Sequence, residues 1–96
     1  MAANFYVSEL LDRYGVLLSD KQFRILDGYY NNDLSLSEIA ENEGITRQGV
    51  SDFVKRGEAQ LTEFEEKLGL IGTVKALKSA AANNNTKEIL NIIDKL

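Results

Sequence analysis

Apolar residues recur every three or four positions along most of this chain, which is the pattern of helices with one buried face. The first stripe lies near the N-terminus and consists of Val7, Leu10, Leu11, Tyr14, Leu17 and Leu18. Glycine disfavours the helical conformation, so Gly15 is expected to loosen the last turn of this segment. The pattern predicts a first helix whose stripe faces a core.

Two capping-box patterns mark the starts of the next two helices. Ser19 is followed three positions later by Gln22, and Ser35 is followed by Glu38. In such a pair the hydroxyl accepts a hydrogen bond from the backbone, and the longer side chain reaches back to the capping residue. The first box predicts a helix from residue 20 with Phe23, Leu26 and Tyr30 inward, flanked by Ile25 and Tyr29. The second predicts a short helix with Leu36, Ile39 and Ala40 inward.

A longer helix is predicted from about Arg47 to Leu68, with Thr46 as its cap. Its heptad-like seam consists of Val50, Val54, Leu61, Phe64, Leu68 and Ile71, with Gly57 in a gap position. The acidic run of Glu63, Glu65, Glu66 and Lys67 is interpreted as a solvated face. A seam of this length extends past the core of a small domain, so its far end needs a second surface.

The last third of the chain offers such a surface. A weak helical pattern covers residues 70–81, and three asparagines at 83–85 precede a final stripe of Ile89, Ile92, Ile93 and Leu96. These two helices can fold back on the seam or pair with a second copy, and we favour a homodimer. The domains expected are a helical unit at 1–69 and a helical tail at 70–96.

Composition narrows the fold and the chemistry. Proline is absent and only seven glycines occur, which favours an all-α fold. A length of 96 residues is enough for one hydrophobic core but not for two. The chain has no cysteine and no histidine, so thiolate nucleophiles, imidazole bases and the usual zinc ligands are excluded. We expect no enzymatic activity, no cofactor and no metal. Because neither a leader nor a membrane-spanning stretch is recognisable, we expect a cytoplasmic protein that does not insert into membranes.

Charge is distributed unevenly along the chain. Residues 1–43 carry three basic and eight acidic side chains, residues 44–57 carry three and one, and residues 58–96 carry five and six. The only positive segment is therefore short and lies in the middle of a chain with a net charge of −4. A nucleic-acid binder usually has a broader basic surface, so such a role would be local or weak.

Residues 36–55 have the spacing of a helix-turn-helix. Ala40 supplies the small residue where the two helices approach, and Gly44 supplies the turn. The inward contacts are assigned to Ile39, Ile45, Val50 and Phe53. Glu43 occupies a position where an apolar residue is expected, and it would place an acid near a bound nucleic-acid backbone.

The candidate nucleic-acid-binding residues are those that a recognition helix would present outward, namely Arg47, Gln48, Ser51, Lys55 and Arg56. Arginine suits guanine, glutamine suits adenine, and Lys55 with Arg56 suits phosphates. Two other interpretations remain open at this point. The same residues can be an ordinary solvated helix face, or they can dock a protein partner.

The segments LLDRYGVLLSDKQ, YYNNDLSLSEIAENEGITRQGVSDFVKR and FEEKL resemble the small bacterial YlxM-like helix-turn-helix proteins over roughly the first seventy residues. The resemblance implies a trihelical core like the fourth region of sigma factors, which lacks the wing of a winged helix. It also implies an accessory role in co-translational targeting, with DNA, the signal recognition particle RNA or the targeting GTPase as partner. Gly49 and Ser51 depart from the family pattern, in which alanine and an aromatic residue are usual.

The leading hypothesis from the sequence is a regulatory protein that binds nucleic acid through the helix-turn-helix. The competing hypothesis is an adaptor in which the same helices dock on the targeting GTPase or on the transcription machinery, without reading bases.

Overall fold

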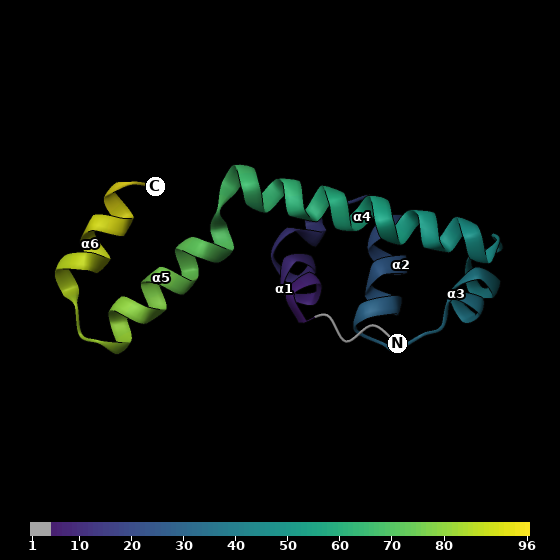
Figure 1. Ribbon diagram of the computed structural model, residues 1–96, viewed down its shortest axis with the longest axis horizontal. Helices are drawn as coiled ribbons and strands as arrows, with labels where there is room; N and C mark the ends of the chain where they lie inside the picture. The colour runs from purple at the N-terminus through teal and green to yellow at the C-terminus, as the bar shows by residue number, and fades with distance from the viewer. Residues whose placement is uncertain (1–4) are drawn as a thin grey trace.

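The chain folds into helices throughout the part that the computed structural model describes, residues 5–96. The elements are α1 (Phe5–Tyr14), the 3₁₀ turn η1 (Gly15–Leu17), α2 (Asp20–Tyr30), α3 (Leu36–Glu43), α4 (Arg47–Leu68), α5 (Leu70–Ala82) and α6 (Thr86–Asp94). Figure 1 shows α1, α2 and α3 along one side of α4, with α5 and α6 extending beyond its C-terminal end. The molecule measures 52 × 21 × 16 Å. The all-α prediction is confirmed.

The N-terminal stripe is confirmed as far as Tyr14. Its buried members are Val7, Leu10, Leu11 and Tyr14. The helix then tightens into η1, and the 3₁₀ turn has three residues per turn rather than 3.6, which changes the direction of the side chains. Leu18 is buried, but Leu17 is 54% exposed, so its predicted inward position is wrong.

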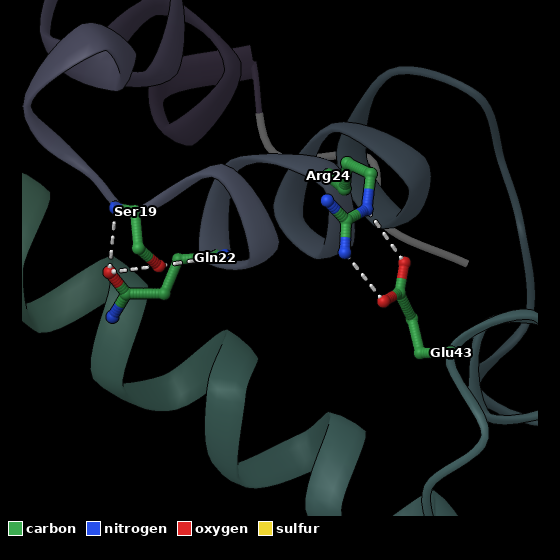
Figure 2. Close-up of polar contacts among 4 residues, drawn as sticks. All are labelled: Ser19, Gln22, Arg24 and Glu43. Atoms are coloured by element: carbon green, nitrogen blue, oxygen red, sulfur yellow. Dashed lines mark hydrogen bonds and ion pairs between the residues drawn. The ribbon is translucent and has the colours of Figure 1, made fainter.

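Both arms of the Ser19–Gln22 capping box form at the start of α2 (Figure 2). The predicted face of α2 is partly wrong. Phe23 is 39% exposed, whereas Ile25 and Leu26 are completely buried. The reason is that α2 packs against α1, α3 and α4, so it is covered over more than one stripe. Phe23 lies at the edge of this packing, where its ring approaches Gly15 closely.

The helix-turn-helix consists of α3, the turn at Gly44 and α4. Gly44 adopts a left-handed conformation with φ of 67°, and the Ile45 N–H donates to the Ala40 carbonyl across the turn. The Thr46 hydroxyl then accepts from the Gly49 N–H at 2.9 Å and caps α4. The predicted bounds of α4, Arg47 to Leu68, are confirmed. The second capping box, at Ser35 and Glu38, also forms.

The core face of α4 is shorter than the predicted seam. Its buried residues are Val50, Val54, Gly57 and Leu61. Phe64 is half-buried and Leu68 is 55% exposed, so the seam does not continue to the end of the helix as expected. Phe53, which was expected in the core, is only half-buried and packs at its edge. Gly57 allows α4 to pack closely against the Leu26 side chain of α2.

A hydrogen-bonded corner joins α4 to α5. The Tyr14 hydroxyl donates to the Glu65 carboxylate and accepts from the Leu70 N–H at 2.9 Å. The same carboxylate accepts from the N–H groups of Ile71 at 3.0 Å and Gly72 at 3.1 Å. Glu65 therefore caps the start of α5. The interpretation of Glu65 as part of a solvated face is wrong, because that interpretation considered only its own helix.

The corner also shifts two acidities. Burial raises the pKa of Glu65, but the hydrogen bonds from Tyr14, Ile71 and Gly72 outweigh it, and the net effect is a lowered pKa. Burial and the neighbouring Glu65 carboxylate raise the pKa of Tyr14. At neutral pH the corner therefore holds a carboxylate and a neutral phenol, which is the combination that its hydrogen bonds need.

Helices α5 and α6 form an arm that projects from the core (Figure 1). Ile71, at the start of α5, is buried, and Lys75 pairs with Glu9 of α1 at 3.5 Å. Helix α6 packs on α5, and none of its residues is fully buried. The arm therefore does not fold back over α4. Its outer apolar side chains, Leu90, Ile93 and Leu96, are exposed.

Candidate nucleic-acid interface

The helix-turn-helix presents the first three turns of α4 on the surface. Val50 and Val54 are buried against the rest of the domain. The exposed residues of these turns are Arg47, Gln48, Asp52, Lys55 and Arg56, and Ser51 is half-buried. All five predicted site residues are thus on one helix and at least partly accessible.

The two arginines of the candidate site lie apart. Arg47 is at the first position of α4 and lines a groove with residues 33–37 and Tyr29. Arg56 is nine residues further along, a distance of about 13 Å at 1.5 Å per residue. Asp33 lines the same groove, so the groove contains an acidic side chain as well as a basic one. A ligand would meet these two arginines at separate points.

An acidic side chain lies on the exposed face of the candidate site. The Gln48 amide donates to the Asp52 carboxylate at 3.0 Å, one helical turn away. To read an adenine, Gln48 would have to exchange this hydrogen bond for two to the base. The carboxylate of Asp52 would also repel a phosphate close to it. These features disfavour tight binding by this face alone.

Glu43 is neutralised by Arg24, a partner that the local sequence pattern does not indicate. The Arg24 guanidinium donates from Nε and from a terminal nitrogen to the two carboxylate oxygens of Glu43, at 3.0 and 2.8 Å (Figure 2). This pair lowers the pKa of Glu43 and raises that of Arg24. The Glu43 side chain is only 15% exposed. The acid expected to face the nucleic-acid backbone is therefore turned toward α2.

A second cationic feature lies where α2 meets α4. The Lys21 Nζ is 5.3 Å from the centre of the Phe53 ring, and the guanidinium carbon of Arg56 is 5.0 Å from it. The sequence pattern does not indicate Lys21, because periodicity predicts Phe53 in the core, where no cation would meet it. The signal available was the position of Lys21 in the first turn of α2, and that is not specific.

Charge changes sign along α4. Residues 47–56 carry three basic side chains and one acidic, a net of two positive charges, and residues 57–68 carry one basic and four acidic, a net of three negative charges. The acidic half leads toward the arm. Along α4, the end that adjoins α3 therefore carries the charge that would attract a nucleic acid.

Potential metal ligands do not gather in the part of the chain described. Across residues 5–96, no three carboxylates lie close enough together to hold a metal ion. No helix in the same range is long and apolar enough to cross a membrane.

Known proteins resemble the chain over nearly its whole length. The sequence model of the UPF0122 family, described as YlxM/p13-like helix-turn-helix proteins, matches residues 1–95. A UPF0122 protein of Clostridium kluyveri is 44% identical over 96 residues, which is 100% of this chain and 82% of the relative. One from Acetivibrio thermocellus is 63% identical over 62 residues, which is 65% of this chain and about half (53%) of that relative's length. A UPF0122 protein of a Thermoanaerobacter species is 45% identical over 91 residues, 95% of this chain and 68% of the relative.

Proposed function

Because the chain belongs to the YlxM/p13-like helix-turn-helix family, we propose that it is a non-enzymatic regulatory protein that binds nucleic acid through the first three turns of α4. The observation that carries this proposal is the positive, exposed half of a helix whose other half is acidic. The residues that would make the contacts are Arg47, Gln48, Ser51, Lys55 and Arg56. The proposed footprint is centred on the half of α4 that adjoins α3.

Helix geometry favours duplex DNA over double-stranded RNA as the ligand. The major groove of B-form DNA is about 12 Å wide and admits a helix, whereas that of A-form RNA is too deep and narrow. Helix α4 stands along one edge of the domain with its outer side uncovered (Figure 1). Single-stranded or looped regions of the signal recognition particle RNA are the alternative ligand.

The proposed cellular role rests on the resemblance to the YlxM-like family and not on the geometry of the site. We place the protein in the cytoplasm, as an accessory factor in the signal recognition particle pathway. The alternative function is that of an adaptor, in which the helix-turn-helix docks on the targeting GTPase or the transcription machinery. Phosphate contacts weaken steeply as salt increases, and docking through apolar surfaces does not. The two functions therefore differ in their salt dependence.

Lys55→Ala is expected to weaken binding to duplex DNA of any sequence and to reduce the slope of log K against log salt by about 0.9. The change removes one exposed charge that would contact a phosphate. Fluorescence anisotropy with a labelled duplex, starting at about 50 mM salt, measures both quantities. Lys67→Ala is the matched control, because Lys67 lies on the acidic half of the same helix and pairs with Glu63.

The wild-type protein could instead bind the targeting GTPase with an affinity that does not depend on salt, and bind neither DNA nor RNA at low salt. That result would replace this proposal by the adaptor function.

We also propose that the arm joins two copies into a homodimer. Leu90 and Ile93 on α6, and Leu96 just after it, are exposed, and a second arm would bury them. Two α4 helices held about 34 Å apart could then enter successive turns of one duplex. Ile93→Glu should convert the dimer into a monomer in sedimentation equilibrium, whereas Asn91→Glu, at another exposed position of α6, should not. A wild-type monomer at tens of micromolar would show that the arm serves another purpose.

A further inference from the structure

Two cationic side chains from two different helices contact the ring of Phe53. Lys21 comes from the first turn of α2 and Arg56 from the third turn of α4, and both lie about 5 Å from the ring centre. The two positive charges therefore lie no more than about 10 Å apart. Like charges repel at such distances, so a site of this kind is stabilised when an anion enters it.

Neither cation is neutralised by a carboxylate of the described chain. The ion pairs within residues 5–96 are Arg24–Glu43, Lys67–Glu63 and Lys75–Glu9. Lys21 and Arg56 belong to none of them. Lys21 acts on Glu43 electrostatically, but both oxygens of that carboxylate are already bonded to Arg24. The two side chains therefore keep their hydrogen-bond donors free for a ligand.

The backbone beneath the two cations is held in place. The Gln22 amide donates to the Gln60 side chain at 2.7 Å, which ties the first turn of α2 to α4 next to Arg56. Half-buried Phe53 fixes the other side, since it packs against the core. The ring also supports the two side chains, because a cation over an aromatic face is attracted to it. The pair is thus a built feature of the α2–α4 junction.

We propose that Lys21 and Arg56 together bind one backbone phosphate of the DNA duplex that α4 contacts, with Phe53 as their common support. This proposal rests on the proposed function, because it assumes that α4 faces a duplex. Residue 56 lies on the flank of α4 that turns toward α2, while residue 47 begins the helix beside α3. One strand of the major groove would pass the Lys21–Arg56 pair.

The proposal adds a residue from outside the helix-turn-helix to the interface. Arginine can present two parallel donors to a phosphate, and lysine adds a flexible point charge. Among the described residues that line the groove at Arg47, Asp33 is acidic and none besides Arg47 is basic. The contacts with backbone phosphates are therefore expected to be stronger on the DNA strand near α2 than on the other strand.

Lys21→Ala should reduce the slope of log K against log salt by about 0.9 for a labelled DNA duplex. Equivalently, the loss of affinity between about 50 and 200 mM salt should be about 3.5-fold smaller than for wild type. Lys78→Ala makes the same change in net charge at an exposed position of α5 and should leave the slope unchanged. Lys21→Arg retains the positive charge and should keep the wild-type slope. Phe53→Leu keeps an apolar side chain but removes the ring face, and should weaken binding about two- to fivefold.

The outcomes separate this proposal from the proposed function. If wild type and Lys55→Ala behave as expected on DNA but Lys21→Ala keeps the wild-type slope, the phosphate site is wrong and the proposed function stands. If Lys21→Ala and Lys78→Ala reduce the slope of log K against log salt equally, the effect comes from net charge in general. That result would also contradict the phosphate site. If wild type binds no duplex DNA at low salt, the proposed function and the site both fail.

Discussion

Ile25→Ala is expected to lower the free energy of unfolding by about 2–5 kcal/mol, whereas Phe23→Ala should lower it by only about 1–2 kcal/mol. Ile25 is completely buried, and its truncation leaves a cavity inside the domain. Phe23 is 39% exposed, so much of its ring is in water before the substitution. The order is informative because the phenylalanine change removes the larger side chain. Chemical denaturation, monitored by helical circular dichroism, gives both values.

A greater loss for Phe23→Ala than for Ile25→Ala would restore the face of α2 that the sequence predicted, and it would contradict the packing of α2 described above.

Gly57→Ala should destabilise the protein by about 1–3 kcal/mol, although alanine is the better helix former. A Cβ at position 57 would lie 2.6 Å from Leu26 Cδ2 and 2.7 Å from its Cδ1. Leu26 is completely buried, so its side chain has little room to move away. Separation of α2 and α4 would disturb the core that positions the helix-turn-helix.

Gly72→Ala is the matched control, because it makes the same change in another helix with the opposite expected sign. A Cβ at position 72 would meet only the Glu65 carboxylate, at 3.7 Å, which is an ordinary contact. The variant should therefore gain up to about 1 kcal/mol from helix propensity. Thermal unfolding of the two variants beside wild type measures the contrast. A stabilised Gly57→Ala would show that α2 and α4 do not approach as closely as the structure has them.

Helix boundaries could be predicted from the sequence because their signals are local. Ser19 with Gln22, and Ser35 with Glu38, determine helix starts through atoms at most three residues apart. Gly44 ends α3 through its own left-handed conformation. For the same reason the helix-turn-helix, which depends on such spacings, could be identified from the order of its residues alone.

Side-chain environments that depend on three helices at once could not be predicted. Periodicity assumes one buried face for each helix, and α2 has more than one, so Phe23 and Ile25 were assigned the wrong way round. Glu65 looks like a surface acid within α4 alone, and becomes a cap only because Tyr14 and the start of α5 meet it. The partner of Glu43, 19 residues away in Arg24, is equally invisible to local patterns.

The residues proposed to bind nucleic acid remain a prediction from motif and charge. Their placement on the exposed, positive half of α4 is compatible with the role, and the Gln48–Asp52 hydrogen bond limits its strength. The chain matches only about half the length of its relative from Acetivibrio thermocellus. The complete activity and the partners of such proteins are therefore part of the proposal.

The most direct test is a titration of the ¹⁵N-labelled protein with a short DNA duplex at about 50 mM salt, followed through backbone amide chemical shifts. We expect the changes to concentrate in residues 47–56 and at Lys21, with little change in the acidic half of α4 or in α6. Changes confined to α5 and α6, or no change at all under these conditions, would contradict the proposal that the first three turns of α4 bind nucleic acid.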